Sequence, residues 1–260
     1  MKRLLPFILL LVIVSSCKYE KLLKSRDYKL KYHKALEYYA DEDYMRAEGL
    51  FEQLKPILRG TKQADTVFLY TAYCSYHQKS YMLAAHYFDE FRKTYGNSKF
   101  AEEAEYMNAY CTYLMSPRPS LDQSYSYQAI SLFGLYISRH PNSERNDECI
   151  QYIEELKNKL VEKSYQSAKL YYNLGDYKAA IIALNNSLDD FPETKYREEI
   201  MFMILKAKFL LAENSIAVKK IERYQSTVDE YYSFMGEFPE SEFLKEATEM
   251  FDDSQIKLKN

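Results

Sequence analysis

Apolar and polar positions follow the period of an amphipathic helix along most of the chain, and the clearest example is residues 164–192. Ala168 is followed after twelve positions by Ala180, after four more by Leu184, and after another eight by Pro192. Gly175 interrupts the helical period between the two alanines. Such a pattern predicts two helices that are joined by a tight turn and ended by proline. Small residues at fixed spacing allow the two helices to approach closely.

Four other parts of the chain carry the same pair of small residues, twelve or twenty positions apart. These pairs are Ala35 and Ala47, Ala72 and Ala84, Ala109 and Ala129, and Ala207 and Thr227. The spacing resembles the tetratricopeptide repeat, a helix-turn-helix unit of roughly 34 residues. Residues 28–260 are therefore expected to form an all-α solenoid of about five such repeats. The expected repeats are residues 29–60, 64–97, 101–142, 145–193 and 196–240, with a linking helix over 142–161 and a capping helix over 243–258.

The N-terminus does not share this pattern. Lys2 and Arg3 precede an apolar run that is too short to span a bilayer and that ends in Val-Ser-Ser-Cys17, which resembles a bacterial lipobox. Residues 1–16 are therefore predicted to be a lipoprotein signal peptide, and Cys17 the lipidated residue. The alternative is an ordinary cleaved signal peptide with a coincidental cysteine. Residues 17–27 then form a short charged tether, whose ten or so residues reach at most about 35 Å, so the first repeat is expected close to the lipid surface.

The composition excludes several classes of function. The formal net charge of −3 is close to neutral, which argues against a general nucleic-acid binder. The four histidines are scattered and no catalytic or phosphate-binding motif occurs, so no enzyme activity, cofactor or metal site is expected. Cys74, Cys111 and Cys149 lack the spacing of a zinc site and are expected to be buried free thiols.

Tyrosine dominates the aromatic residues, with 27 tyrosines, 14 phenylalanines and no tryptophan. When each unit is numbered from its first alanine, tyrosines recur three positions before it, one after it and four after it. These offsets share one face of a helix. We expect a peptide-binding groove along that face, although the rings are alternatively packed between repeats. Its predicted residues are Tyr32, Tyr39, Tyr73, Tyr76, Tyr106, Tyr110, Tyr113, Tyr165 and Tyr172.

One segment carries a more specific resemblance. The run TYGNSKFAEEAEYMNAYCTY, residues 94–113, precedes a Pro-x-x-Asp-Gln loop and then His-Pro-Asn-Ser at residues 140–143. Together with the lipobox and the repeats, it resembles the BamD family, the lipoproteins of the outer-membrane β-barrel assembly machinery. The resemblance covers about residues 30–250, with Gly96 in place of the usual proline and a degenerate fifth repeat. The matching loop residues are Asn97, Ser98, Pro119, Asp122 and Gln123.

The resemblance implies a non-enzymatic scaffold that is lipid-anchored in the outer membrane and faces the periplasm. Its implied partners are the central β-barrel assembly protein, other assembly lipoproteins and unfolded barrel precursors. The alternative is another helical-repeat adaptor lipoprotein of the cell envelope, for example in glycan uptake, because tyrosines also stack on sugars.

Overall fold

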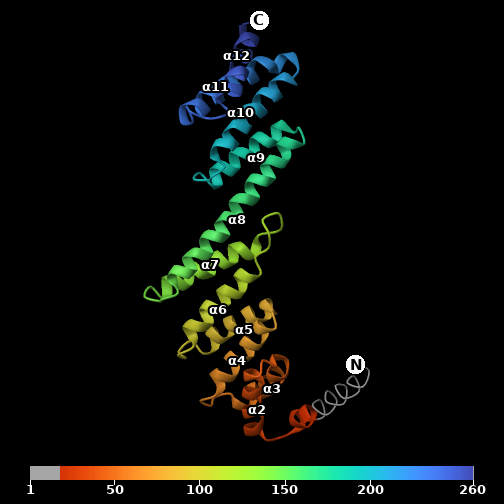
Figure 1. The fold of residues 1–260 in the computed structure, drawn as a ribbon, viewed down its shortest axis with the longest axis vertical. Coiled ribbons are helices and arrows are strands. Elements are labelled where there is room, and N and C mark those ends of the chain that lie inside the picture. Colours follow the sequence, from red (N-terminus) through yellow and green to blue (C-terminus); the bar gives the residue numbers. More distant parts are fainter. Residues whose placement is uncertain (1–17, 260) are drawn as a thin grey trace, which may run out of the picture. The chain divides into compact units, whose positions relative to one another are not determined.

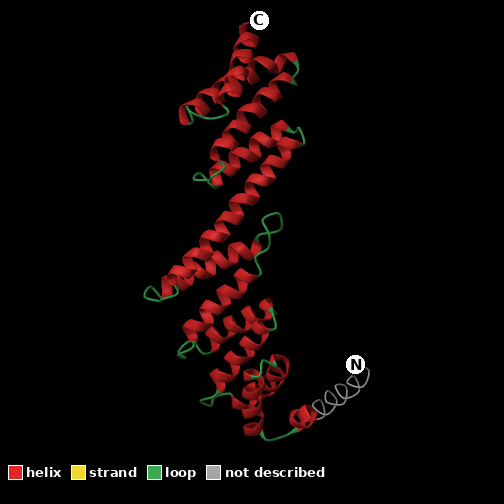
Figure 2. Ribbon diagram, viewed as in Figure 1, coloured by secondary structure: helices red, strands yellow, loops and turns green. Residues whose placement is uncertain are grey.

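The computed structural model describes residues 18–259, and every regular element in that part of the chain is an α-helix (Figures 1 and 2). A short helix over residues 18–24 is followed by five pairs of helices and a final single helix. The pairs and the final helix are α2 (Tyr28–Ala40) and α3 (Tyr44–Leu58), α4 (Ala64–His77) and α5 (Tyr81–Thr94), α6 (Ala101–Leu114) and α7 (Ser124–Arg139), α8 (Asn146–Asn173) and α9 (Tyr177–Asp190), α10 (Arg197–Glu213) and α11 (Ala217–Glu237), and α12 (Leu244–Lys259). The expected all-α series of about five hairpins with a terminal helix is confirmed.

The small residues that define the repeat frame are all in the core. Each of the ten is at most 1% exposed: Ala35, Ala47, Ala72, Ala84, Ala109, Ala129, Ala168, Ala180, Ala207 and Thr227. The large residue four positions after the second of each pair is buried as well: Phe51, Phe88, Phe133, Leu184 and Tyr231. Short side chains bring the helix backbones close, and the large residue fills the adjoining space. The repeated positions in the sequence therefore mark the residues that pack in the core of each hairpin.

The residue contacts divide the chain into two units. The first comprises the described residues up to Pro117 together with Gln123–Leu156, and the second comprises Arg118–Asp122 and Lys157–259. Helix α8 contributes its first part to one unit and its second part to the other. The separate linking helix over 142–161 is therefore a wrong expectation. No glycine or proline lies between Asn146 and Asn173, so nothing ends the helix before the first helix of the next hairpin begins.

The connections at Ser98, Ser143, Thr194 and Ser241 share one turn geometry, which Thr61 repeats before α4 with the Gln63 N–H at 3.3 Å. In each of the four, the hydroxyl accepts a hydrogen bond from the backbone N–H two residues later, at 3.0–3.4 Å. The next helix begins three residues after each hydroxyl, at Ala101, Asn146, Arg197 and Leu244. The sequence places a Ser or Thr before each of these helices, where it could cap the helix. Helices α6 and α10 instead have Phe100 and Tyr196 at their N-caps, with no side-chain cap bond. The hydroxyls therefore close the turn before the helix and do not cap it.

The segment after residue 17 is packed on the first hairpin. The Tyr19 hydroxyl donates to the Arg46 carbonyl oxygen at 3.1 Å, and the Tyr19 ring meets the Tyr38 ring edge-on at 5.8 Å. A Cβ at Gly49, inside α3, would lie 2.4 Å from the Tyr19 hydroxyl oxygen, so only glycine leaves room for that oxygen. Lys31 is 6% exposed and donates to the Leu23 carbonyl oxygen at 2.9 Å. The expected tether is therefore largely a docked helix.

The signal peptide and Cys17 lie outside the described residues. Within residues 18–259, no helix combines the length and the apolar character that a bilayer crossing requires.

Candidate functional site: a tyrosine network in the first unit

Six of the nine predicted groove tyrosines meet in the first unit. Tyr39, Tyr73, Tyr76, Tyr106, Tyr110 and Tyr113 connect through rings whose centroids are 4.5–6.4 Å apart, with His77 and Tyr152 completing the series. We call these eight residues the tyrosine network. Neighbours along one helix explain most of the contacts, and the 6.3 Å contact of Tyr76 with Tyr110 joins α4 to α6.

Two members of the tyrosine network were missed by sequence reasoning. His77 joins Tyr39 to Tyr73, and its Nε2 lies 3.2 Å from the Tyr39 hydroxyl oxygen. The helical period would have excluded it, because it follows Tyr76 directly. Tyr152 contacts Tyr110 and Tyr113, at 5.5 and 4.5 Å between ring centroids. It lies in the part of α8 that has no frame alanine, so the repeat numbering could not reach it.

Glutamates in the first helix of the next hairpin accept hydrogen bonds from three hydroxyl groups of the tyrosine network. The Tyr73 hydroxyl donates to Glu103, the Tyr106 hydroxyl donates to Glu148 at 2.9 Å, and the Tyr113 hydroxyl donates to Glu155 at 2.5 Å. Burial, and then the hydrogen bond to Glu155, raise the pKa of Tyr113 to about 12. Tyr113 therefore stays protonated at neutral pH and keeps donating to Glu155. Charge-assisted bonds of this kind fix the orientation of each ring.

The remaining predicted tyrosines lie apart from the tyrosine network. Tyr165 stacks on Tyr196 at 4.0 Å between ring centroids, and Tyr172 meets the Tyr177 ring edge-on; all four residues belong to the second unit. Tyr32 contacts His33. These pairs therefore do not extend the ring contacts that connect the tyrosine network within the first unit.

Burial separates the predicted tyrosines further. Tyr106 and Tyr165 are only 8% and 6% exposed, whereas the other seven are half-buried. Both occupy the position three before the frame alanine, where the second hairpin has Leu69, which is 5% exposed. In these three hairpins the position therefore faces into the packing, and the expectation of a groove-facing ring does not hold for Tyr106 and Tyr165. Tyr32, at the same position of the first hairpin, is half-buried.

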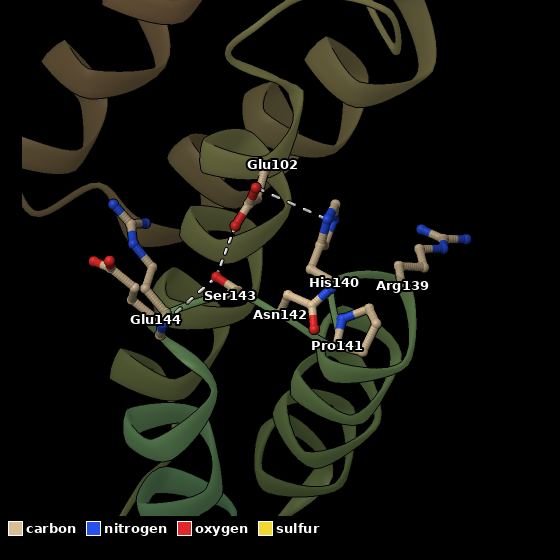
Figure 3. A pocket seen from close by; sticks show the side chains of 8 residues that line it. Glu102, Arg139, His140, Pro141, Asn142, Ser143 and Glu144 are labelled. Carbon is tan, nitrogen blue, oxygen red and sulfur yellow. Dashed lines mark hydrogen bonds and ion pairs between the residues drawn. The ribbon is translucent and has the colours of Figure 1, made fainter.

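The glutamates of the signature run 94–113 also brace the turn before α8 (Figure 3). Glu102 accepts from the Ser143 hydroxyl at 2.7 Å and from the Tyr136 hydroxyl at 2.9 Å. Glu105 accepts from Arg139 at 2.8 Å and lies 2.8 Å from Nε2 of His140. These contacts line an open pocket of about 540 Å³, formed by Glu102 and residues 139–145. The polar groups of the signature run are thus largely engaged with their own chain.

Arg145 links this turn to the tyrosine network. Its guanidinium carbon lies 4.3 Å from the centre of the Tyr106 ring, and its Nη2 donates to Glu103 at 2.6 Å. Glu103 also accepts from the Tyr73 hydroxyl. The Glu103 carboxylate on α6 therefore connects Tyr73 of α4 with Arg145 at the start of α8.

The signature loop residues are in two places. Ser98 donates to Asp65 at 2.8 Å and Asn97 is exposed beside it. Gln123 is 3% exposed and accepts from Ser126 at 2.6 Å in the first unit. Pro119 and Asp122 belong to the second unit by their contacts, as does Leu121, whose carbonyl oxygen accepts from Lys163 at 2.6 Å.

The other candidate groups were the cysteines and histidines. Cys74, Cys111 and Cys149 are buried free thiols, as expected, and burial raises the pKa of Cys149 to about 11. Among the residues that the structure describes, no group of three or more His, Cys, Asp or Glu residues is arranged to hold a metal ion.

Comparison with protein-family models matches residues 25–223 to YfiO, described as an outer membrane lipoprotein. The chain belongs to this family. The YfiO family is the BamD family that the signature run resembles, so that recognition is confirmed. The YfiO match ends before the C-terminus of α11 and leaves out α12, the least regular part of the repeat pattern.

Two solved structures are similar to this YfiO-family chain at low identity. One is the TPR2AB domain of yeast Sti1 in complex with an Hsp90 peptide, with 12% identity, a TM-score of 0.41, and coverage of 88% of this chain and 98% of that chain. The other is the TPR domain of P58(IPK), with 15% identity, a TM-score of 0.43, and coverage of 92% and 68%. Comparison with curated proteins gave no match.

Proposed function

We propose that this chain is a non-enzymatic scaffold of outer-membrane β-barrel assembly, anchored by a lipid on Cys17 at the periplasmic face of the outer membrane. The observation that carries the proposal is the match of residues 25–223 to a family of outer membrane lipoproteins. In this role the chain binds the central barrel assembly protein, other assembly lipoproteins and incoming barrel precursors.

The tyrosine network supports binding of extended, aromatic segments of such precursors. Seven of its eight residues keep part of their surface exposed, and glutamates already fix four of its hydroxyl groups. Rings that are held in place before binding lose little conformational freedom when a peptide stacks on them. Tyr32, Tyr165 and Tyr172 lie outside this surface and are not part of the proposed binding face.

Photo-crosslinking in membranes tests the proposal. A photoreactive residue at His77, in the tyrosine network, is compared with the same residue at His86, which is also exposed and lies on the other helix of that hairpin. We expect capture of a large barrel protein and of nascent barrels at position 77 and little capture at position 86. Capture of sugar importers alone would refute barrel assembly and favour the glycan-uptake alternative.

A substitution pair tests the binding face separately. Tyr76→Ala removes a ring from the tyrosine network, and Tyr127→Ala removes an exposed ring of α7 that has no contact with it. Stacking of a peptide's aromatic side chain on one ring is worth about 1 kcal/mol. Tyr76→Ala is therefore expected to weaken binding of a barrel-derived peptide several-fold. Equal affinities of the two variants would exclude the tyrosine network as the binding face.

A further inference from the structure

The residues next to the proposed lipid anchor are strongly basic, unlike the rest of the chain. Residues 18–34 contain seven of the chain's 35 Lys and Arg residues but only two of its 38 Asp and Glu residues. The formal net charge of the whole chain is nevertheless −3. The positive segment attracts anions locally, whereas the net negative charge of the rest of the chain repels them.

Most of these charges face solvent. The side chains of Lys18, Lys21 and Lys24 lie on the short helix over 18–24, and Arg26 and Lys29 follow it; all five are exposed. Lys24 lies 3.9 Å from Glu20, and among the described residues neither Lys18 nor Lys21 has an ion-pair partner. We call these five residues the basic surface. The other two basic residues differ: Lys31 is buried and donates to the Leu23 carbonyl oxygen of the short helix, and Lys34 is half-buried and donates to Glu37.

The basic surface is held rigidly, because the Tyr19 contacts fasten the short helix to α2 and α3. Packing begins only two residues after Cys17, so at most about 7 Å of chain separates Cys17 from the docked Tyr19, instead of about 35 Å. A lipid on Cys17 would therefore bring the basic surface to the headgroups of the bilayer that holds the lipid.

A pocket beside the short helix suits a headgroup. It has a volume of about 450 Å³ and is lined by Lys18 and Lys21 of the short helix and by Lys34 of α2, with Leu22 and Leu30 supplying apolar surface. Glu37, which accepts from Lys34, and Asp41 lie on the same lining. Ammonium groups bind phosphate oxygens, and leucine side chains pack against the apolar part of a lipid.

We propose that the basic surface binds the anionic phospholipids of the membrane in which the chain is anchored, and so orients the first hairpin against the bilayer. This inference rests on membrane attachment through Cys17 but not on any role in barrel assembly. Each Lys or Arg near an anionic bilayer surface adds about 1 kcal/mol of attraction. The excess of acidic residues in the rest of the chain disfavours other orientations at the same surface.

Vesicle binding by the unlipidated protein tests the proposal. The chain from residue 17 onward with Cys17→Ser is mixed with vesicles of phosphatidylethanolamine and phosphatidylglycerol, or of phosphatidylethanolamine and phosphatidylcholine. Binding is expected only to the anionic vesicles and is expected to fall at high salt. Because no acyl chain and no partner protein is present, the result does not depend on whether barrel assembly is the function.

Matched variants assign the binding to the basic surface. Each exposed lysine near an anionic bilayer changes the partition roughly fivefold, so Lys18→Gln/Lys21→Gln/Lys24→Gln is expected to bind about a hundredfold less. The control Lys178→Gln/Lys219→Gln/Lys245→Gln removes three exposed lysines of the second unit and the same total charge. Circular dichroism confirms that both variants are folded.

Two outcomes would overturn the proposal. One is equal binding of the two triple variants to the anionic vesicles, which would show that net charge alone matters. The other is a triple variant at 18, 21 and 24 that binds vesicles normally but loses a protein partner in membranes, which would assign the basic surface to a protein.

Discussion

Because the Tyr19 hydroxyl lies against Gly49, the effect of Gly49→Ala on stability is expected to depend on whether Tyr19 is present. Gly49 lies inside α3, where alanine is normally preferred by about 1 kcal/mol. A Cβ at this position would lie 2.4 Å from the Tyr19 hydroxyl oxygen, so Gly49→Ala must push the Tyr19 ring away. That displacement breaks the hydrogen bond to the Arg46 carbonyl and the edge-on contact with Tyr38.

The expected energies have opposite signs in the two backgrounds. The lost hydrogen bond costs about 1 kcal/mol, and the lost ring contact costs about 1 kcal/mol more. Gly49→Ala is therefore expected to destabilise the protein by about 1 kcal/mol when Tyr19 is present. In a Tyr19→Ala background the same substitution is expected to stabilise it by about 1 kcal/mol. The coupling energy of the double-mutant cycle is then about 2 kcal/mol.

Urea unfolding followed by helical circular dichroism measures this cycle on the chain from residue 18 onward. The free energies of unfolding of the original chain, both single variants and the double variant are compared. The comparison requires that the slope of this free energy against urea concentration is the same for all four. If Gly49→Ala stabilises the protein equally with and without Tyr19, the short helix is not docked over α3, and the rigid placement of the basic surface is refuted.

Three further predictions concern the signature turn and the thiols. Tyr136→Phe removes the hydroxyl that donates to Glu102 and should lower the free energy of unfolding by about 1 kcal/mol, measured by urea titration; no loss would contradict the bracing role. Hydrogen bonds from Ser143 and Tyr136 lower the pKa of Glu102 below its ordinary 4.5, so its contribution is present above that pH and is lost as the pH falls through the folded value. The melting temperature should therefore fall more steeply on acidification in the original chain than in Glu102→Gln, and parallel curves would refute this. Burial raises the pKa of Cys149 to about 11 and that of Cys111 to about 12, so a thiol reagent at neutral pH should react only after denaturation, and rapid reaction of the folded protein would contradict their burial.

The hairpins and their frame were determined by the sequence alone. Paired small residues at a spacing of twelve or twenty, followed by a large apolar residue, require two helices that pack closely, and every one of these positions is buried. The hydroxyl residues after each hairpin likewise specify a local turn, because the bond they accept comes from a backbone N–H two residues away. Such features depend on neighbours in the chain, so a sequence pattern is enough to find them.

Whether each tyrosine ring is exposed or buried was decided only by the tertiary structure. Tyr76 and Tyr106 share one helical face in the repeat frame, yet Tyr76 keeps part of its surface exposed and Tyr106 is buried under Arg145. The difference arises from residues far away in the chain, such as Glu148, 42 positions from Tyr106, whose position no local pattern specifies.

The docking of residues 18–24 also required the tertiary structure. Their charges predict a solvated tether, and only the space that Gly49 leaves on α3 shows that Tyr19 is held there. A period along the chain reports which face of a helix is apolar. It does not report which distant side chain covers that face, because that depends on how separate helices meet.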